Sequence, residues 1–150
     1  MSERSLDRMD KRLLTELQTD ARLSFAELGR RAGLSTPATA ERVRKLEERG
    51  VLRGYRAEID SHAIGYPVTA FIRLHVPAQS YAKVLAVLEN LPEVREAHHV
   101  TGDASFVLKV VAQSLMALET LIASFDAFGS TETSVVLSTR LAVRGLPIEV

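Results

Sequence analysis

The stretch GLSTPATAERVRKLEERG, residues 33–50, combines a turn with an arginine-rich helix. Gly33 suits the left-handed position that follows a helix, and Ser35 is a favourable N-cap. Pro37 is tolerated in the first turn of a helix, because the amides there have no helical acceptor to lose. The stretch therefore predicts a tight turn, a capped helix and a stop at Gly50.

Two shorter helices are expected before this turn. Apolar residues recur at helical spacing after the plausible N-cap Asp7, which predicts a helix over residues 7–19. Ser24 and Glu27 have the spacing of a capping box and start a second helix, which runs to Ala32. Three short helices, the last two separated by about three residues, match the helix-turn-helix arrangement.

Residues 51–59, VLRGYRAEI, contain two β-compatible stretches around Arg53 and Gly54, and we interpret them as a wing or an exit strand. The segment SHAIGYP, residues 61–67, interrupts the pattern with glycine and proline. We therefore expect a winged helix-turn-helix domain at residues 1–60, a linker at residues 61–67 and a second domain at residues 68–150.

Strands and helices alternate beyond the linker. The expected order is strand 68–76, helix 80–90, strand 94–100, strand 106–112, helix 114–128 and strand 131–140, with a short strand or tail from Leu141. This βαββαβ order is that of a ferredoxin-like domain, so the predicted fold class is α+β. Two helices cover one face of such a sheet, and the uncovered face or edge is a natural dimer surface.

The chain carries 19 basic and 19 acidic residues and has no net charge, but the charges are unevenly distributed. Residues 30–56 contain eight lysines and arginines against three glutamates, a local net charge of +5. One basic patch on a neutral protein is typical of a surface that docks an anionic partner such as DNA.

The third helix has two usable faces. With successive residues 100° apart, Ala40, Val43 and Leu46 gather on one side, and Ala38, Arg42, Lys45 and Arg49 on the other. We expect Arg42 to contact a base, since a guanidinium can bond both O6 and N7 of guanine. The alternative without a binding role is a solvated helix with ion pairs from Glu41 to Lys45 and from Arg44 to Glu48.

The other candidate DNA contacts fall into two groups. Phosphate contacts are expected from the cations Arg31, Arg44, Lys45 and Arg53. Small or hydroxyl-bearing residues at the start of the helix allow close approach to DNA, and these are Ser35, Thr36, Ala38 and Thr39. One such motif offers few contacts, so we expect a symmetric dimer that reads a palindromic, AT-rich-centred operator.

Residues 6–60, LDRMDKRLLTELQTDARLSFAELGRRAGLSTPATAERVRKLEERGVLRGYRAEID, followed by IGYP and a βαββαβ pattern that contains TGD, resemble the Lrp/AsnC family of transcription regulators. The resemblance covers nearly the whole chain. It implies a winged helix-turn-helix that binds double-stranded DNA and a second domain that dimerises and senses small molecules, often amino acids. Family dimers commonly assemble further, into tetramers or octamers.

The resemblance also implies an effector site between subunits, lined by the turn TGDAS, residues 101–105. In the family this turn often reads Gly-Asp-Tyr-Asp, so Gly102 and Asp103 match, while Ala104 and Ser105 depart from it. The implied effector-binding set is His99, Thr101, Gly102, Asp103, Ala104, Ser105, Thr133 and Ser134. Losing one carboxylate and an aromatic wall leaves amino-acid specificity open, and with it the choice between a different effector and none. The alternative to an effector site is a tight hairpin turn with no binding role.

Other function classes are disfavoured. The chain has no cysteine, which excludes disulfides and thiolate metal sites. His98 and His99 are adjacent on a predicted strand and point to opposite faces, so we expect neither a metal nor a cofactor. No apolar run is long enough for a membrane helix, so a cytoplasmic protein is expected. No catalytic residues are assigned; the alternatives are an enzyme resembling the siroheme decarboxylases and a DNA-architectural protein.

Overall fold

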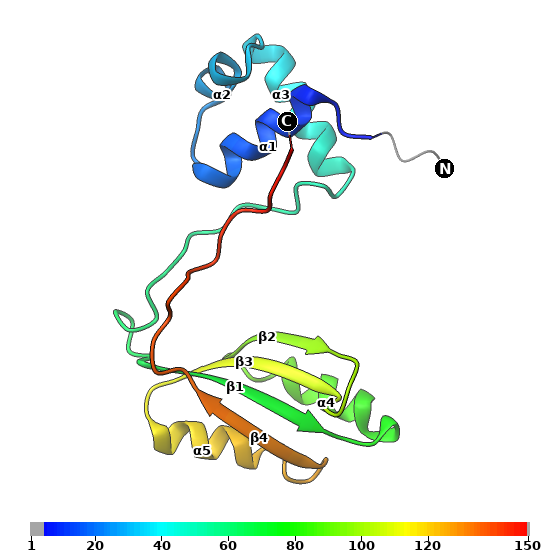
Figure 1. Cartoon of the computed structure of the whole chain (residues 1–150), viewed down its shortest axis with the longest axis vertical. Coiled ribbons are helices and arrows are strands. Elements are labelled where there is room, and N and C mark those ends of the chain that lie inside the picture. Colours follow the sequence, from blue (N-terminus) through cyan, green and yellow to red (C-terminus); the bar gives the residue numbers. More distant parts are fainter. Residues whose placement is uncertain (1–4, 150) are drawn as a thin grey trace. The chain divides into compact units, whose positions relative to one another are not determined.

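The computed structural model describes residues 5–149 (Figure 1). The chain divides into two compact units. Among the described residues, one consists of residues 5–58 together with residues 141–149, and the other of Ile59–Arg140. The sequence placed residues 141–150 in the second domain, whereas the described part of this segment, residues 141–149, groups with the first unit.

The first unit contains three helices, α1 (Arg8–Thr19), α2 (Phe25–Ala32) and α3 (Thr36–Glu48). Each begins at a polar N-cap whose side chain accepts a hydrogen bond from a first-turn amide: Asp7, Ser24 and Ser35. Gly33 ends α2 with φ of 75°, as the turn requires. The three expected helices are therefore confirmed, with the turn between α2 and α3.

The helices share one apolar core. Its buried side chains are Leu13, Leu17, Leu28, Ala32 and Val43. Leu23, Leu34 and Leu52 pack against this cluster from the loops. The core therefore joins all three helices, and the position of α3 depends on α1 and α2.

The second unit is a four-stranded antiparallel sheet with helices. Its strands are β1 (Val68–His75), β2 (Val94–His99), β3 (Phe106–Ala112) and β4 (Ser130–Val135), in the order β2-β3-β1-β4. After β1 come a 3-10 turn, η1 (Ala78–Ser80), and helix α4 (Tyr81–Leu88), and α5 (Leu115–Ala123) follows β3. The expected ferredoxin-like order is confirmed.

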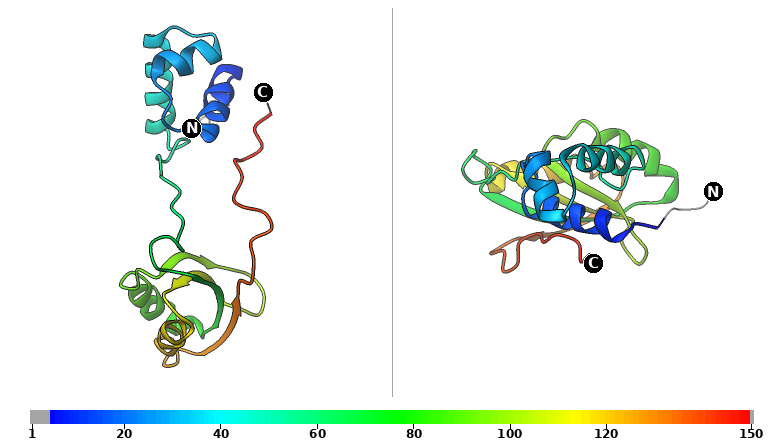
Figure 2. Two further views of the ribbon diagram at one scale, coloured as in Figure 1. Left: turned by 90° about the vertical axis from the view of Figure 1, so that its left-hand side faces the viewer. Right: turned by 90° about the horizontal axis from the view of Figure 1, so that it is seen from above.

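Both helices cover the same face of the sheet (Figure 2). Val84 of α4 and Leu118 and Leu121 of α5 belong to one buried cluster with alternate residues of β1 and β3. The strand residues that alternate with the buried ones point to the other side of the sheet, which we call the open face. They are Phe71, Arg73, Glu96, His98, Val107, Lys109, Glu132 and Ser134.

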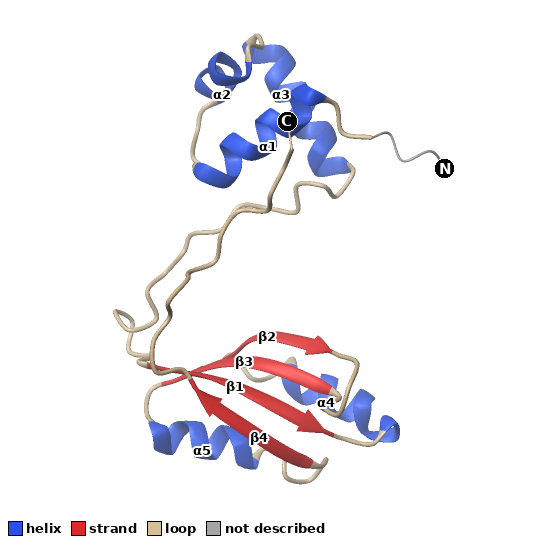
Figure 3. Cartoon of the chain, in the orientation of Figure 1, coloured by secondary structure: helices blue, strands red, loops and turns tan. Residues whose placement is uncertain are grey.

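The prediction of a wing or exit strand at residues 51–59 is wrong. Within residues 5–149 no strand precedes β1, and the segment after α3 is drawn as loop in Figure 3. The amides of Val51 and Leu52 both donate to the carbonyl of Leu46, so they close the end of α3 instead of pairing in a hairpin. A two-stranded hairpin without a third strand is marginal, and Leu52 contributes more by packing on the helical core.

Several expected elements are shorter than the sequence suggested, most clearly α5 and β4. Helix α5 ends at Ala123 rather than residue 128, because Ser124 and Phe125 bond back to carbonyls three residues earlier and form turns. Strand β4 ends at Val135 rather than residue 140, because β1, its neighbour, begins at Val68 and offers little further pairing. Residues 141–149 form no strand, which leaves the tail as the alternative that the structure supports.

Candidate nucleic-acid interface and ligand-binding turn

The turn between α2 and α3 depends on close backbone contact at Gly29. A Cβ atom at this position would lie 2.6 Å from Oγ1 of Thr39 and 2.7 Å from the carbonyl oxygen of Leu34. The Leu34 amide also donates to the Gly29 carbonyl, at 2.8 Å. Glycine at this site therefore lets α3 pack directly on α2. The only sequence signal for this close packing of α2 and α3 is a small residue, Gly29, in the middle of a short helix.

The prediction that the hydroxyl of Thr39 is available to DNA is wrong. Thr39 is fully buried, and its Oγ1 donates to the carbonyl of Ser35 at 2.9 Å. The helical wheel placed Ala40 on the packing face, but the buried residues of α3 are Thr39, Val43 and Leu46. Ser35 and Thr36 remain exposed at the start of the helix, and Ala38 is half-buried.

Arg42 turns toward α1. Its Nη1 donates to Oδ2 of Asp7 at 2.7 Å and to Oδ1 of Asp10 at 2.8 Å. Asp10 is 8% exposed, and Asp7 caps α1, so the guanidinium joins the start of α1 to the middle of α3. These carboxylates raise the pKa of Arg42, Asp7 first. The amide of Asp10 and then Arg42 lower the pKa of Asp7. To contact a base, Arg42 would have to leave both carboxylates.

The outward face of α3 carries a group of ion pairs between arginine or lysine and glutamate. Arg44 bonds to Glu41, with Nη2 2.7 Å from Oε1, and also to Glu48. Lys45 lies 3.2 Å from the same Glu41 carboxylate. Arg44, and then Lys45, hold the pKa of Glu41 at about 2. These exposed cations are available to a phosphate that competes with the glutamates, because exposed ion pairs are weak.

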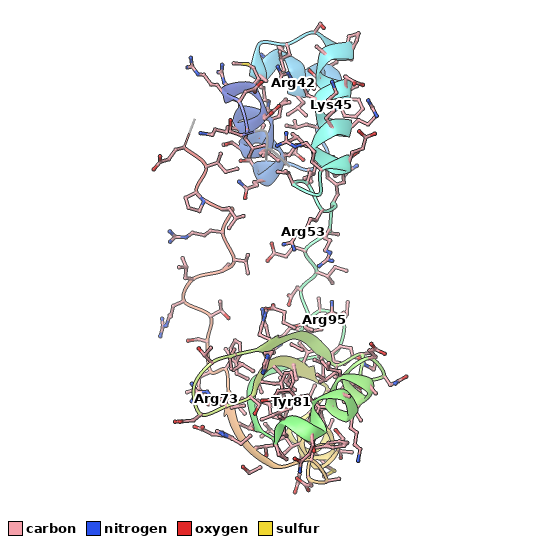
Figure 4. The ribbon with its side chains drawn as sticks, turned by 90° about the vertical axis from the view of Figure 1, so that its right-hand side faces the viewer. Arg42, Lys45, Arg53, Arg73, Tyr81 and Arg95 are labelled. Carbon is pink, nitrogen blue, oxygen red and sulfur yellow. The ribbon has the colours of Figure 1, made fainter. Side chains whose placement is uncertain are left out.

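Arg31 and Arg53 flank α3 in the sequence. Arg31, in α2, bonds to Glu27 at 2.9 Å and to Glu16 of α1 at 3.0 Å. The pKa of Glu27 falls to about 2, owing to Arg30 and then Arg31. Arg53 is exposed on the segment after α3 (Figure 4), where Arg42 and Lys45 are also labelled. The expected phosphate contacts therefore lie on or beside α2 and α3.

A hollow of about 880 Å³ lies beside α3 in the first unit. Its lining comes from the start of α1 and from one side of α3: Ser5, Asp7, Asp10, Ala38, Glu41, Arg42, Lys45, Leu46, Glu48 and Arg49. The expected basic face of α3 is thus matched with acidic residues. Asp10 is the residue that the sequence pattern missed, although its place beside Met9 and Leu13 on the packed side of α1 was a usable signal.

The second unit has a smaller hollow, of about 370 Å³, at the turn after β2. It brings together Thr101, Asp103 and Ala104 of the expected effector set with residues of three strands: Arg73 and His75 of β1, Val107 of β3 and Glu132 of β4. Nδ1 of His75 lies 3.0 Å from the carbonyl oxygen of Asp103 and ties the turn to β1. Gly102, between Thr101 and Asp103 in the turn, has φ of 108°, a conformation that favours glycine.

Besides Gly102, four expected effector residues do not line this hollow. Ser105 secures the turn, since its Oγ donates to the Val76 carbonyl at 2.8 Å. The ring of His99 packs against Tyr81 and Phe106, with ring centroids 5.0 and 5.2 Å away. Thr133 lies opposite Ile72 and faces the helices, and its buried Oγ1 has no hydrogen-bond partner. Ser134 is on the open face, opposite Phe71.

Arg73 and Glu132 are the functional candidates that sequence reasoning missed. They face each other across β1 and β4, with Nη1 3.5 Å from Oε2, and both line the hollow. Only the strand register brings them together, because they are 59 positions apart in the sequence. Opposite charges on two expected strands were the available signal.

Within residues 5–149, no helix is both long and apolar enough to cross a bilayer. In the same range, no three His, Asp or Glu side chains are grouped so that they could hold a metal ion. His98 and His99 face opposite sides of the sheet, as their register against Val107 and Phe106 requires.

Two family models match the chain, one in each unit. Residues 6–47 match the AsnC-type helix-turn-helix domain, and residues 69–145 match the Lrp/AsnC ligand binding domain. The first match covers α1, α2 and nearly all of α3, and the second covers the sheet with its helices.

Relatives agree with these matches. The chain is 39% identical to the leucine-responsive regulatory protein of Rhizobium meliloti, over 93% of this chain and 90% of that protein. It is 35% identical to the solved structure of LrpC from Bacillus subtilis, with a TM-score of 0.86 and coverage of 90% and 96% of the two chains. A transcriptional regulator of Neisseria meningitidis, solved in complex with L-methionine, is 25% identical with a TM-score of 0.89, and the match covers 95% and 97%. The chain belongs to the Lrp/AsnC family of helix-turn-helix transcriptional regulators.

Proposed function

We propose that this regulator binds double-stranded DNA sequence-specifically through the start and outward face of α3. The observation that carries this proposal is that α3 begins at an exposed, capped turn and presents Arg44 and Lys45 outward. Free amides at the start of a helix favour a phosphate. Ser35, Thr36 and Ala38 let this end approach base edges, and Arg31, Arg44, Lys45 and Arg53 bind phosphates.

Arg42 has a positioning role in this proposal. Its two bonds to Asp7 and Asp10 fix the angle between α1 and α3, so it acts on DNA through the orientation of α3. To contact a base, Arg42 would have to break its hydrogen bonds to Asp7 and Asp10 and replace them with hydrogen bonds to the base. This assignment replaces the base contact expected from the helical wheel.

The functional unit is a homodimer whose second copy covers the open face. Phe71 lies on this face and is 42% exposed, between the pairs Glu96–Lys109 and Arg73–Glu132. An apolar centre with a charged surround is the usual anatomy of an interface. Two copies present two α3 helices to two half-sites, which a specific operator needs. Assembly beyond the dimer, to tetramers or octamers, uses other surfaces.

The effector is a small zwitterion such as an amino acid, bound in the hollow at the TGDAS turn. Arg73 supplies a partner for a carboxylate, and Asp103 and Glu132 supply partners for an ammonium group. These groups replace the carboxylate that Ser105 cannot provide. The Neisseria meningitidis relative with bound L-methionine supports an amino-acid ligand. Binding shifts DNA affinity only by its differential affinity for the two states.

The test is a DNA-binding titration with the full chain. Duplexes selected from a random pool are titrated at fixed salt with wild type and K45A, with and without each proteinogenic amino acid. Wild type binds the selected duplex far more tightly than a scrambled one, and K45A weakens both equally. Equal affinity for selected and scrambled duplexes indicates an architectural protein. Siroheme turnover without selective DNA binding indicates an enzyme.

A further inference from the structure

The C-terminal tail, residues 141–149, contacts the DNA-binding unit although it follows the last strand of the other unit (Figure 1 shows its red end beside α1). Gln18 of α1 bonds the main chain of Leu146 twice. Its Nε2 donates to the Leu146 carbonyl at 3.1 Å, and its Oε1 accepts from the Leu146 amide at 2.5 Å. The carboxamide thus satisfies both main-chain groups of one residue, as a neighbouring strand would.

Gly145 makes this approach possible. A Cβ atom on Gly145 would lie 3.1 Å from Cδ and Oε1 of Gln18 and 3.3 Å from its Cβ. The next residue after the clasp, Pro147, has no amide that needs a partner. The sequence Gly145-Leu146-Pro147 is therefore suited to lie against a glutamine side chain.

The end of the tail reaches an apolar hollow of about 510 Å³ in the same unit. Pro147 and Ile148 contribute to it together with residues of α1, of the segments that flank α1 and of the segment after α3: Leu6, Leu14, Leu17, Ala21, Val51, Leu52 and Tyr55. Ile148 is half-buried, whereas residues 141–147 are exposed. Apolar contact at Ile148 adds to the polar clasp at Leu146.

We propose that the tail is a second tether between the two units, anchored on α1 by Gln18, which restricts the freedom of the DNA-binding unit. The first connection runs from α3 to β1, and the second runs from β4 to the clasp. Ten residues, 136–145, reach at most about 35 Å, so the second connection limits how far the units separate. Two tethers restrict orientation more than one, and they raise the effective concentration of one DNA-binding unit at its half-site. This consequence rests on the proposed DNA binding.

The first test uses the natural absence of cysteine. The Cβ separation of 3.3 Å between Gln18 and position 145 is close to that of a disulfide, about 3.8 Å. Q18C/G145C therefore oxidises readily to an intrachain disulfide, detected by peptide mass spectrometry and non-reducing electrophoresis. The matched control Q18C/A142C, three residues earlier in the tail, oxidises slowly. An interchain disulfide, or equal rates for the two pairs, overturns the proposal.

The second test measures binding to a selected duplex. Q18A binds about threefold to tenfold more weakly than wild type, and the control Q79A, on η1, binds as wild type does. Oxidised Q18C/G145C binds as wild type, and its reduced form binds as Q18A. Equal binding by all forms overturns the tether. Wild type that binds no selected duplex contradicts the proposed function instead, while the disulfide result still tests the tail.

Discussion

Arg42 of α3 and Asp10 of α1 are joined by a hydrogen-bonded ion pair, with Nη1 2.8 Å from Oδ1. The side chain of Asp10 is 12% exposed and that of Arg42 is 33% exposed, so the pair is largely shielded from solvent. Because Asp7 shares the same guanidinium nitrogen, one arginine joins two helices.

Removing this arginine should destabilise the first unit. R42A removes the hydrogen-bonded partner of the buried Asp10 and leaves it Arg49, at 4.0 Å, and the Asp7 amide, so it costs about 2 kcal/mol of unfolding free energy. R42K recovers part of it, because a lysine lacks the planar fork of donors. Chemical denaturation measures the loss, with R53A as an exposed control. An R42A variant as stable as R53A contradicts the positioning role.

Acid titration should identify the pairs on α3. The carboxyl group of Glu41 has a pKa of about 2 against an ordinary 4.5. A lowered pKa in the folded state means that this stabilisation is present above pH 4.5 and is lost as the pH falls toward 2. In R44A the pKa of Glu41 rises toward its ordinary value, while that of Glu27 stays low. Carboxyl-carbon NMR measures both, and an unchanged Glu41 argues against the pair.

Glu41 should limit DNA affinity, because it competes with phosphate for Arg44 and Lys45. E41Q therefore binds DNA more tightly than wild type, severalfold at low salt, and the exposed control E58Q changes affinity less. K45A has the opposite effect and reduces the slope of log affinity against log salt by about 0.9, the value for one phosphate contact. Anisotropy titrations at several salt concentrations measure both. Unchanged affinity in E41Q shows that DNA does not use these cations.

Gly29 should tolerate no larger residue. In G29A the new Cβ meets Thr39 and a main-chain oxygen, and only the former can be trimmed. We expect G29A to lower the unfolding free energy by about 1–3 kcal/mol. The double variant G29A/T39A, which removes the Thr39 hydroxyl, stays destabilised, because the Leu34 carbonyl remains in place. Thermal unfolding of the pair tests this expectation, and wild-type stability in G29A would refute the close packing.

Asp103 should affect the ligand response but not DNA binding itself. D103N removes the charge at the turn while keeping its size, so it weakens amino-acid binding at least about tenfold. DNA affinity without amino acid stays unchanged, because Asp103 belongs to the second unit. Calorimetry measures ligand binding and anisotropy measures DNA binding. Wild-type ligand affinity in D103N would remove this turn from the effector site.

The sequence predicted most of the fold because local signals determine it. Asp7, Ser24 and Gly33 mark helix ends by their own chemistry, and the βαββαβ order follows from hydrophobic periodicity. The wing was wrong because β-compatible residues at 51–59 have no third strand to pair with. Propensity without a partner does not make a strand.

The candidate sites were less predictable because long-range contacts decide them. A helical wheel placed Arg42 outward, but the wheel contains no information about Asp10 on another helix. Thr39 looked accessible for the same reason. The Arg73–Glu132 pair and the Gln18 clasp depend on register and on chain return, which no local pattern encodes.

Selection of duplexes from a random pool by the full chain, followed by sequencing, tests the central claim most directly. The account predicts enrichment of one palindromic sequence, with an AT-rich centre and two half-sites about one helical turn, or a multiple of it, apart. K45A should recover the same sequence at higher protein concentration. Enrichment of no sequence, or of a single half-site at full affinity, would contradict the account.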